Sequence, residues 1–376
     1  MKTLRDINID NKTVIVRFDY NVPIKNGIII DDTRIKKSLK TLNYILEKAS
    51  HVVILSHLGR INTKEDLKNN SLKPVCDYLS NLINENIKFC IYENEYELIN
   101  SNKIVMMENT RLFDIDNKRE SNCDEELSKY FSSFGDVFVN DAFGVSHRKN
   151  ASNVGISKYL ESCVGFLIEE EINNLNKIIN PSRPFIVIMG GSKVSDKIGI
   201  INNLIKKVDK LLIGGGMAYT FLKAKGYEIG KSVCEDDYLD YAREVLKSGK
   251  IILPVDSYIE NMEIKNIEDI LKEDKCLDIG PKTVSLFEKE LINSKTVFFN
   301  GPLGRFEDGY SYGTKKIFEY LNKINGIVIV GGGDTVSSVN KLLNKNNFII
   351  STGGGAALEY LEGKELPGVV YEEEKF

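Results

Sequence analysis

Three segments in the second half of the chain each run an apolar stretch into three consecutive glycines and then into a helix-forming stretch. They span residues 211–220, 327–335 and 349–357. Glycine lets the backbone approach a bulky anion closely, and a following helix N-terminus adds about half a positive charge. A carboxylate, Asp334, directly follows only one of these runs. The pattern predicts a cradle for nucleotide phosphates in which Asp334 binds Mg²⁺.

Short, almost entirely apolar stretches alternate with helical stretches along the whole chain. Such strands are typical of parallel sheets covered by helices on both faces. We therefore expect an α/β protein with two doubly wound, Rossmann-like parallel-sheet domains. The predicted strands are 14–18, 51–55, 103–107 and 136–140 in the first half, and 185–189, 210–213, 250–253, 296–299 and 327–330 in the second.

One helix is expected to join the two domains. Residues 166–179 have helical spacing, and Pro181 and Pro184 follow directly. Proline ends a helix, so the boundary is expected between Gly165 and Pro184. We place the first domain at 1–165 and the second at 166–364, with the helix as a hinge.

Composition excludes several classes of function. The 376 residues carry a net charge of −4, which gives no support for binding nucleic acid or a membrane surface. We find no apolar run of about 18 residues and no apolar signal stretch at the start. The six cysteines include no CxxC pair. A reducing, cytoplasmic location is expected.

Polar residues directly follow the predicted strands of the first half. In open α/β sheets the ligand binds beyond the carboxyl ends of the strands, and arginine suits phosphate and carboxylate groups. A lone arginine at such a place is usually a surface ion pair, but the repetition favours a site for a small, multiply charged anion. For His57 and His147 a structural role and ligand contact stay open. The candidates are Asp19, Asn21, Arg34, His57, Arg60, Arg111 and Arg148.

In the second half, two lysines follow the Gly190-Gly191 pair. Lys193 and Lys197 are four residues apart and would share one helix face if the helix begins there. They favour a polyphosphate, although glycines after a strand often form only a tight turn. Glu307, in the Gly/Pro loop after the strand predicted at 296–299, is a candidate for ribose hydroxyls. We find neither GxxxxGK[ST] nor GxGxxG after a first strand, which argues against a P-loop and a dinucleotide site.

Taken together, the motifs resemble the phosphoglycerate kinase family over essentially the whole chain and in the order of that family. The matching motifs are RFDYNVP (17–23), SHLGR (56–60), ENTR (108–111), NDAFG (140–144), KVSDK (193–197), NGP (300–302), GGGDT (331–335) and STGGG (351–355). The resemblance implies a two-lobed kinase that transfers a phosphoryl group reversibly between 1,3-bisphosphoglycerate and ADP, giving 3-phosphoglycerate and ATP. It also implies small-molecule substrates, Mg²⁺ with the nucleotide, and a monomer.

The same resemblance assigns roles to particular residues. The phosphoglycerate would bind to Asp19, Asn21, Arg34, His57, Arg60, Arg111 and Arg148. The nucleotide would bind to Lys197, Gly215, Asn300, Glu307, Gly332, Gly333, Asp334 and Thr335, with Asp334 on the metal. Transfer itself would depend on Arg34, Lys193, Lys197, Gly333 and Gly355. The family pattern further implies that about 365–376 pack on the first domain, and that the hinge closes.

Departures from the family pattern gather near the expected base pocket. Arg305 replaces a valine that ordinarily lines the adenine slot, Cys276 replaces a glycine, and Ser192 stands where alanine is common. Our hypothesis is that Arg305 alters adenine affinity or relaxes discrimination against guanine; the alternative is that it points to solvent. Residues 254–275 also differ from the family.

Two other classes of function stay open at this point. A two-domain dehydrogenase of similar size is one, although the missing GxGxxG argues against it. A kinase fold that serves only as a binding or structural protein is the other. Retention of Arg34, Lys197 and Asp334 argues against the latter.

Overall fold

The structure is a computed structural model that describes residues 1–333, 335 and 347–369. The chain divides into two compact units, which we call unit 1 (1–172 with 365–376) and unit 2 (173–364). The division falls inside α6 (Phe166–Ile179), whereas the sequence places the boundary just before this helix.

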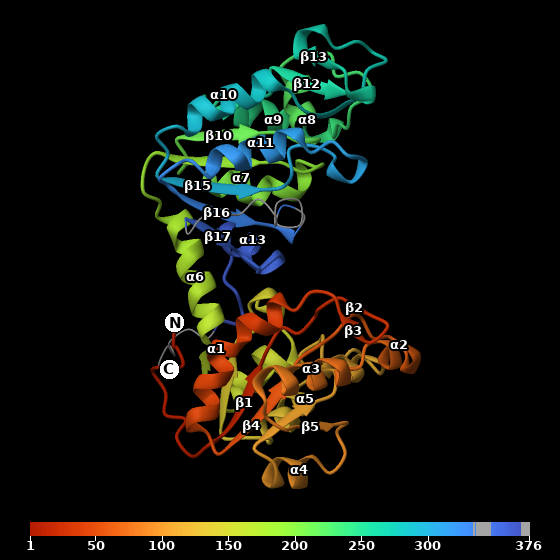
Figure 1. The fold of residues 1–376 in the computed structure, drawn as a ribbon, viewed down its shortest axis with the longest axis vertical. Coiled ribbons are helices and arrows are strands. Elements are labelled where there is room, and N and C mark those ends of the chain that lie inside the picture. The colour runs from red at the N-terminus through yellow and green to blue at the C-terminus, as the bar shows by residue number, and fades with distance from the viewer. Residues whose placement is uncertain (334, 336–346, 370–376) are drawn as a thin grey trace. The chain divides into compact units, whose positions relative to one another are not determined.

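Unit 1 is built on a six-stranded sheet in the order β5-β6-β4-β1-β7-β8, and every neighbouring pair in it is parallel. This confirms the predicted parallel α/β architecture of the first half (Figure 1). The strands are β1 (Thr13–Arg17), β4 (His51–Leu55), β5 (Ile87–Cys90), β6 (Ile104–Met107), β7 (Val137–Asn140) and β8 (Glu161–Val164).

Helices cover both faces of this sheet because alternate strand residues point to opposite sides. Val14 and Val16 of β1 belong to a core cluster with side chains of α1 and α3, whereas Ile15 belongs to one with α4 and α5. A small hairpin, β2 (Ile24–Lys25) and β3 (Ile28–Ile29), follows β1. The helices are α1 (Thr33–Lys48), α2 (Lys64–Asn69), α3 (Lys73–Ile83), α4 (Glu95–Ser101) and α5 (Glu125–Ser132).

Unit 2 contains a second six-stranded parallel sheet, in the order β11-β10-β9-β15-β16-β17. Numbered along the chain, this is the 3-2-1-4-5-6 order of doubly wound nucleotide-binding folds. The strands are β9 (Phe185–Met189), β10 (Lys210–Ile213), β11 (Ile251–Ile252), β15 (Thr296–Asn300), β16 (Ile327–Gly331) and β17 (Phe348–Ile350).

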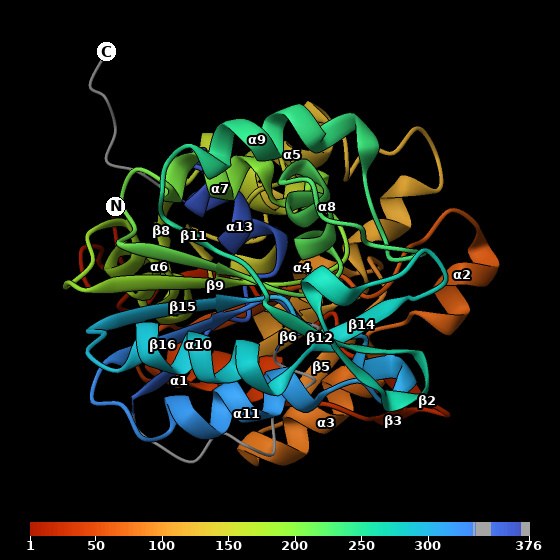
Figure 2. The ribbon, with the colours of Figure 1, turned by 90° about the horizontal axis from the view of Figure 1, so that it is seen from above.

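The second sheet is also covered on both faces. Figure 2 shows α7, α8 and α9 on one side of it, and α10 and α11 on the other. Phe287 of α10 and Phe318 of α11 are fully buried in one core cluster with Ile188, Val297 and Phe299 of the sheet. The helices are α7 (Ile198–Leu204), α8 (Met217–Ala224), α9 (Leu239–Leu246), α10 (Pro281–Leu291), α11 (Tyr312–Leu321) and α13 (Gly355–Leu361).

A small antiparallel sheet, which the sequence did not predict, occupies much of the stretch that departs from the family pattern. It consists of β12 (Asp256–Ile259), β13 (Ile264–Asn266) and β14 (Cys276–Ile279), in the order β13-β12-β14. These strands are short and mix polar with apolar residues, so the search for continuous apolar runs missed them. Across the described residues, no helix is both long and apolar enough to cross a bilayer.

Candidate active site

In unit 1 the site lies where the strand order reverses. β1 has β4 on one side and β7 on the other, and the amide of Asp141 donates to the carbonyl of Arg17 at 2.8 Å just beyond the β1 and β7 ends. Ligands of open α/β sheets bind in the crevice at such a switch point. All the candidate residues of the first half follow the carboxyl end of a strand of this sheet, except Arg34, which is in the first turn of α1.

Asp19 and Arg34 form the best-defined ion pair of this site. Arg34 Nη1 lies 2.9 Å from Asp19 Oδ2 and also donates to the carbonyl of Asn21 at 3.2 Å. A Cβ at Gly144 would come within 2.5 Å of the same Asp19 oxygen, so only glycine leaves room for the carboxylate there. The pair holds one nitrogen of Arg34, and the described residues supply no partner for Nη2. Arg34 is therefore oriented while keeping donors for a ligand.

The peptide of Gly59 connects Asn21 with Arg111. Its N–H donates to Asn21 Oδ1 at 2.9 Å, and its carbonyl accepts from Arg111 Nη1 at 2.8 Å. Gly59 has a φ of +60°, and a Cβ there would lie 2.2 Å from Asn70 Oδ1. Its backbone conformation and surroundings thus require glycine. The SHLGR motif acts here through its backbone, which fixes the positions of polar groups from two other strand ends.

The electrostatic surroundings of His57 are positive. Burial, followed by the charges of Arg17, Arg111, Arg148 and Arg34, holds the pKa of His57 well below its usual value. Burial lowers the pKa of Arg111, and the nearby charges of Arg148 and Arg60 lower it further. These interactions bring together His57 and all four arginines predicted for the site. Because like charges repel, such a group is best balanced by a multiply charged anion.

Two members of this group are more exposed than the rest. Arg60 is exposed and lines a shallow pocket with Arg111. Arg148 is also exposed, and its Nε donates to His147 Nε2 at 3.2 Å. The long, exposed side chains are the parts of the site that can adjust to a ligand.

Sequence reasoning missed Arg17 and Glu120 as parts of the site. Arg17 ends β1 with only 1% of its surface exposed, and Glu120 is also 1% exposed. Ser152 connects them, since its hydroxyl accepts from Arg17 Nε at 3.4 Å and donates to Glu120. An arginine in the predicted buried strand 14–18 was the available signal, because a buried charge needs a partner.

The site of unit 2 lies at the switch point between β9 and β15. The amide of Gly190 donates to the carbonyl of Asn300, and that of Gly191 to the carbonyl of Pro302, both at 2.9 Å. A Cβ at Gly190 would lie 2.2 Å from the Pro302 carbonyl oxygen, so the two loops touch through bare backbone. The glycine pair therefore does more than form a tight turn, because it lets the two strand ends meet.

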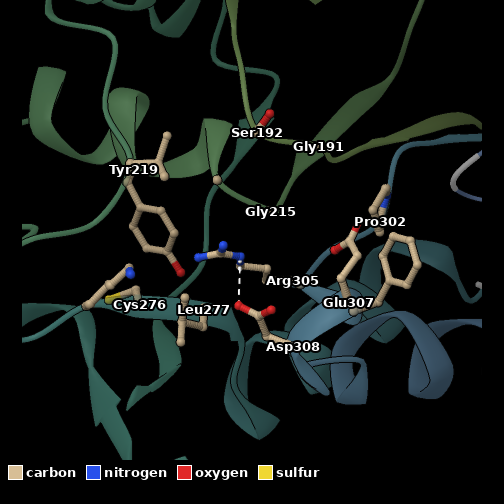
Figure 3. A pocket seen from close by; sticks show the side chains of 15 residues that line it. Gly191, Ser192, Gly215, Tyr219, Cys276, Leu277, Pro302, Arg305, Glu307 and Asp308 are labelled. Atoms are coloured by element: carbon tan, nitrogen blue, oxygen red, sulfur yellow. Dashed lines mark ion pairs between the residues drawn. The ribbon is translucent and has the colours of Figure 1, made fainter.

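Beside these loops is a pocket of about 530 Å³, a size in the range of small-molecule sites (Figure 3). Gly215, with a φ of +65°, lies against Gly191, where a Cβ would be 2.7 Å from backbone atoms. Gly215 and Gly216 of the glycine run 214–216 thus form part of the wall. The pocket is lined by, among others, Gly191, Gly215, Gly216, Tyr219, Pro302 and Glu307.

An unsatisfied amide marks the adjoining part of the site. Asn300 is fully buried; its Oδ1 accepts from Lys197 Nζ, while its Nδ2 has no partner among the described residues. A Cβ at Gly332, whose φ is +91°, would lie 3.1 Å from Nδ2, whereas a Cβ at Gly333 would meet no atom of the described residues within 4 Å. An unpaired buried donor costs about 1–3 kcal/mol, which a ligand oxygen would offset. The residues therefore fit a nucleotide phosphate group.

Thr335 ties this turn to the β15 loop. It is fully buried, and its Oγ1 accepts from the amide of Gly301 at 2.7 Å. Asp334, the predicted Mg²⁺ ligand, lies outside the described residues. Among those described, no group of three or more His, Cys, Asp and Glu residues could hold a metal ion. Gly355 begins α13, after Gly354 with a φ of +49°.

The expectation that Lys193 and Lys197 share a helix face is wrong. Lys193 is exposed and precedes a 3₁₀ turn, η5 (Ser195–Lys197), and α7 starts only at Ile198. Glu235 holds this turn by accepting from the amide and hydroxyl of Ser195 at 3.0 and 2.6 Å. The tertiary contact thus delays the helix, and only Lys197 is fixed in the site.

All three departures from the family pattern, Ser192, Cys276 and Arg305, line the pocket. Arg305 precedes the 3₁₀ turn η9 (Phe306–Asp308), and its Nε lies 2.9 Å from Asp308 Oδ2. Its side chain is 53% exposed. Figure 3 shows the guanidinium group extending into the pocket with Asp308 beside it. Arg305 is thus at once partly in solvent and part of the pocket wall.

Comparison with known proteins gives a consistent result. The family model described as phosphoglycerate kinase matches residues 4–364. The phosphoglycerate kinase of Macrococcus caseolyticus is 46% identical over 98% of both chains, and that of Lactobacillus delbrueckii subsp. lactis is 48% identical over 97% of both. These similarities leave no room for the dehydrogenase alternative.

Solved structures agree with the sequence relatives. The phosphoglycerate kinase of Coxiella burnetii superposes with a TM-score of 0.89 at 37% identity, covering 98% of this chain and 97% of its own. That of Pyrococcus horikoshii superposes with a TM-score of 0.81 at 30% identity and the same coverage. Family model, sequence relatives and fold coincide over nearly the full length, and the chain belongs to the phosphoglycerate kinase family.

Proposed function

We propose a residue-level account of the reaction of this chain, which as a phosphoglycerate kinase transfers a phosphoryl group reversibly between 1,3-bisphosphoglycerate and ADP in glycolysis. In it, unit 1 binds the phosphoglycerate and unit 2 binds the nucleotide. The observation that carries this division is the contrast between the two switch points. One gathers arginines around His57, and the other offers a glycine-lined pocket with an unpaired amide on Asn300.

The phosphoglycerate would be held by the polar residues at the strand ends of unit 1. The exposed Arg60 and Arg148 and the half-buried Arg111 form the strongly positive part, which suits the phosphate group. Arg34, held by Asp19, would bind the carboxyl end that gives or takes the phosphoryl group. Asn21 fixes the Gly59 peptide from which Arg111 is oriented.

The nucleotide would occupy the pocket of unit 2. Gly215 and Glu307 line it, which places a carboxylate where ribose hydroxyls can donate. Lys197, Asn300 and the turn from Gly332 to Thr335 would bind the phosphates, with Asp334 as the Mg²⁺ ligand. Bound Mg²⁺ would neutralise charge on the phosphate oxygens.

No protein nucleophile is needed for this transfer. The carboxylate and the nucleotide phosphate exchange the phosphoryl group in line, so the protein contributes positioning and positive charge. Arg34 would act from unit 1, and Lys193, Lys197 and the amides of Gly333 and Gly355 from unit 2. Because the two sets belong to different units, we propose that the units approach each other when both substrates are bound. Small-angle X-ray scattering tests this, and an unchanged radius of gyration with both substrates would contradict it.

A coupled assay of ATP formation from 1,3-bisphosphoglycerate, with and without Mg²⁺, tests the account as a whole. Arg34→Gln should lower kcat/KM by about 10²–10³-fold, the usual cost of removing one transition-state donor. Arg5→Gln is the matched control, since Arg5 is an exposed arginine that pairs with Glu169 at 2.6 Å and is not among the candidate site residues. Equal activities of the two variants would refute the role of Arg34.

We further propose that Arg305 widens the choice of purine base. Its guanidinium group carries donors only and is steadied by Asp308 at the pocket wall. Guanine presents two adjacent acceptors, O6 and N7, to such a fork, whereas adenine presents one acceptor and one amino donor. The pocket should therefore accept GDP far better than a pocket with valine at this position.

A further inference from the structure

The strongest feature that the proposed reaction leaves unexplained is the contact between Arg17 and His57. Arg17 Nη2 lies 3.1 Å from His57 Nδ1, and both side chains are buried, with 1% and 3% of their surfaces exposed. Arginine is charged under all ordinary conditions and can only donate hydrogen bonds. His57 Nδ1 must therefore be the acceptor, which means that it carries no proton.

This donor–acceptor assignment fixes the state of the whole ring. A neutral imidazole has one proton, so if Nδ1 has none, the proton is on Nε2. A second proton on Nδ1 would point directly at the guanidinium group. The described residues give His57 Nε2 no hydrogen-bond partner, yet it is not among the fully buried unsatisfied atoms. Nε2 thus retains accessible surface and can donate to a ligand.

Arg17 is itself held rigidly by three contacts. Nη1 donates to the carbonyl of Phe18, Nε donates to Ser152 Oγ at 3.4 Å, and Nη2 reaches His57. Ser152 passes the connection to Glu120, which also accepts from the Thr110 hydroxyl at 3.1 Å. Apart from the bond to the Phe18 carbonyl, these hydrogen bonds run from donor to acceptor toward either Glu120 or His57. These hydrogen bonds leave Arg17 no alternative orientation in which all of its acceptors keep a donor.

We propose that Arg17 is a positioning residue that keeps His57 in the neutral tautomer with its proton on Nε2, aimed at the bound phosphoglycerate. The proposal rests on the proposed function, because it takes the ligand of His57 to be that anion. It gives His57 the role of a fixed hydrogen-bond donor rather than a titrating cation. The positive charge of the site then comes from arginines alone, which do not change with pH.

The charged groups that face His57 support this assignment. Among the charged groups of the described residues, those with the largest effect on the pKa of His57 are Arg17, Arg111, Arg148 and Arg34. All four are cations, so they disfavour a further positive charge on the imidazole. Two described carboxylates face Arg17 rather than the imidazole: Glu120, which Ser152 connects to Arg17, and Asp19, which pairs with Arg34. Binding of the anionic substrate should therefore not depend on protonation of His57 at neutral pH.

Long-range ¹H–¹⁵N NMR of the full chain tests the proposal directly, since the sequence has only three histidines. In the free protein His57 Nε2 should show the protonated shift and Nδ1 the unprotonated one, unchanged from pH 5.5 to 8. A proton on Nδ1, or titration near pH 6.5, would overturn the proposal. Arg17→Met should produce a tautomer mixture and a titration in this range, while Arg5→Met, the control, should leave the signals unchanged.

A second pair of variants keeps the test independent of whether Arg17→Met folds. The amide nitrogen of glutamine reaches the place of Nε2–H, whereas asparagine reaches only the place of Nδ1. His57→Gln should raise the KM for 3-phosphoglycerate less than His57→Asn does, by about 10-fold, the value of one hydrogen bond to a charged group. An equal or greater loss with His57→Gln would overturn the proposal. Absence of any phosphoryl transfer in the unmodified chain would instead refute the proposed function.

Discussion

The carboxylate of Asp141 accepts a hydrogen bond from the backbone amide of Leu167 at 2.9 Å, at the first turn of α6. The same oxygen, Oδ1, also accepts from the amide of Ile168 at 3.2 Å, while Oδ2 is buried without a partner among the described residues. Asp141 follows β7 directly, so it connects a strand end of the unit 1 site with the helix at which the two units divide.

This buried carboxyl group should make the stability of the protein depend on pH. Burial raises the pKa of Asp141 from 3.8 to about 7, so between these values the native state binds more protons than the unfolded state. The stabilisation is complete below pH 4 and is lost as the pH rises to 7. Asp141→Asn should flatten this dependence, with a difference of about 4 kcal/mol between pH 4 and 8.

Urea unfolding at several pH values measures this difference. Asp10→Asn is the matched control, because Asp10 is exposed. If the two variants show the same pH profile as the unmodified chain, Asp141 does not titrate in this range.

Asn300 should be required for nucleotide binding but not for phosphoglycerate binding. Asn300→Asp keeps the shape of the side chain but replaces the unpaired Nδ2 donor with a carboxylate oxygen, which repels phosphate. The KM for ADP should rise at least tenfold, equivalent to about 1.4 kcal/mol, while the KM for 3-phosphoglycerate stays unchanged. Asn8→Asp serves as the control, because Asn8 is exposed and its side-chain oxygen only accepts a hydrogen bond from the amide of Asp10. A parallel rise in both KM values would contradict a local role.

Gly215 and Gly249 have the same backbone conformation but different surroundings. Substitution of each one therefore distinguishes the cost of backbone strain from the cost of steric overlap. Gly215 and Gly249 have φ values of +65° and +66°, but a Cβ would meet Gly191 backbone at 2.7 Å in the first and nothing within 4 Å in the second. Gly249→Ala should cost about 1–2 kcal/mol of stability through the left-handed conformation alone. Gly215→Ala should cost more and should also weaken ADP binding. Thermal unfolding and calorimetric titration measure both, and equal effects would argue against the packing of Gly215 on Gly191.

Arg305→Val should restore a preference for adenine. The kcat/KM ratio of GDP to ADP should fall by about tenfold or more, because one fork to guanine contributes about 1–3 kcal/mol of discrimination. Arg305→Lys, which keeps the charge but not the fork, should behave like the valine variant, and Asp308→Asn should give an intermediate ratio. A ratio that is the same in all four proteins would place Arg305 outside base recognition.

The motifs of the sequence predicted the parallel sheets and the groups of site residues because both depend on local patterns. Apolar runs predicted β1, β4, β6 and β7, and the polar residues just after them do follow strand ends. The shorter or more polar strands β5 and β8, and the sheet of β12 to β14, escaped this reasoning, whereas β17 falls at the apolar stretch predicted before the third glycine run. These strands are held by hydrogen bonds to partner strands elsewhere in the chain, which no local period records.

Pairing between distant residues could not be predicted either. Glu120 lies more than a hundred residues from Arg17 along the chain, and the Ser152 that connects them follows a different strand end. The helix that would place Lys193 and Lys197 on one face does not begin at Lys193, because Glu235, remote in sequence, holds Ser195 in a 3₁₀ turn.

The sequence by itself determined the family, the two parallel sheets and the kinds of group at each strand end, because residue type and spacing express these directly. The tertiary structure alone decided which of these groups are buried, which are paired, and in what protonation state. Those properties depend on the distance between side chains and on exclusion of water. An arginine in the sequence is only a charge. Arg17, enclosed beside Nδ1 of His57, becomes a donor that fixes where a neighbouring proton resides.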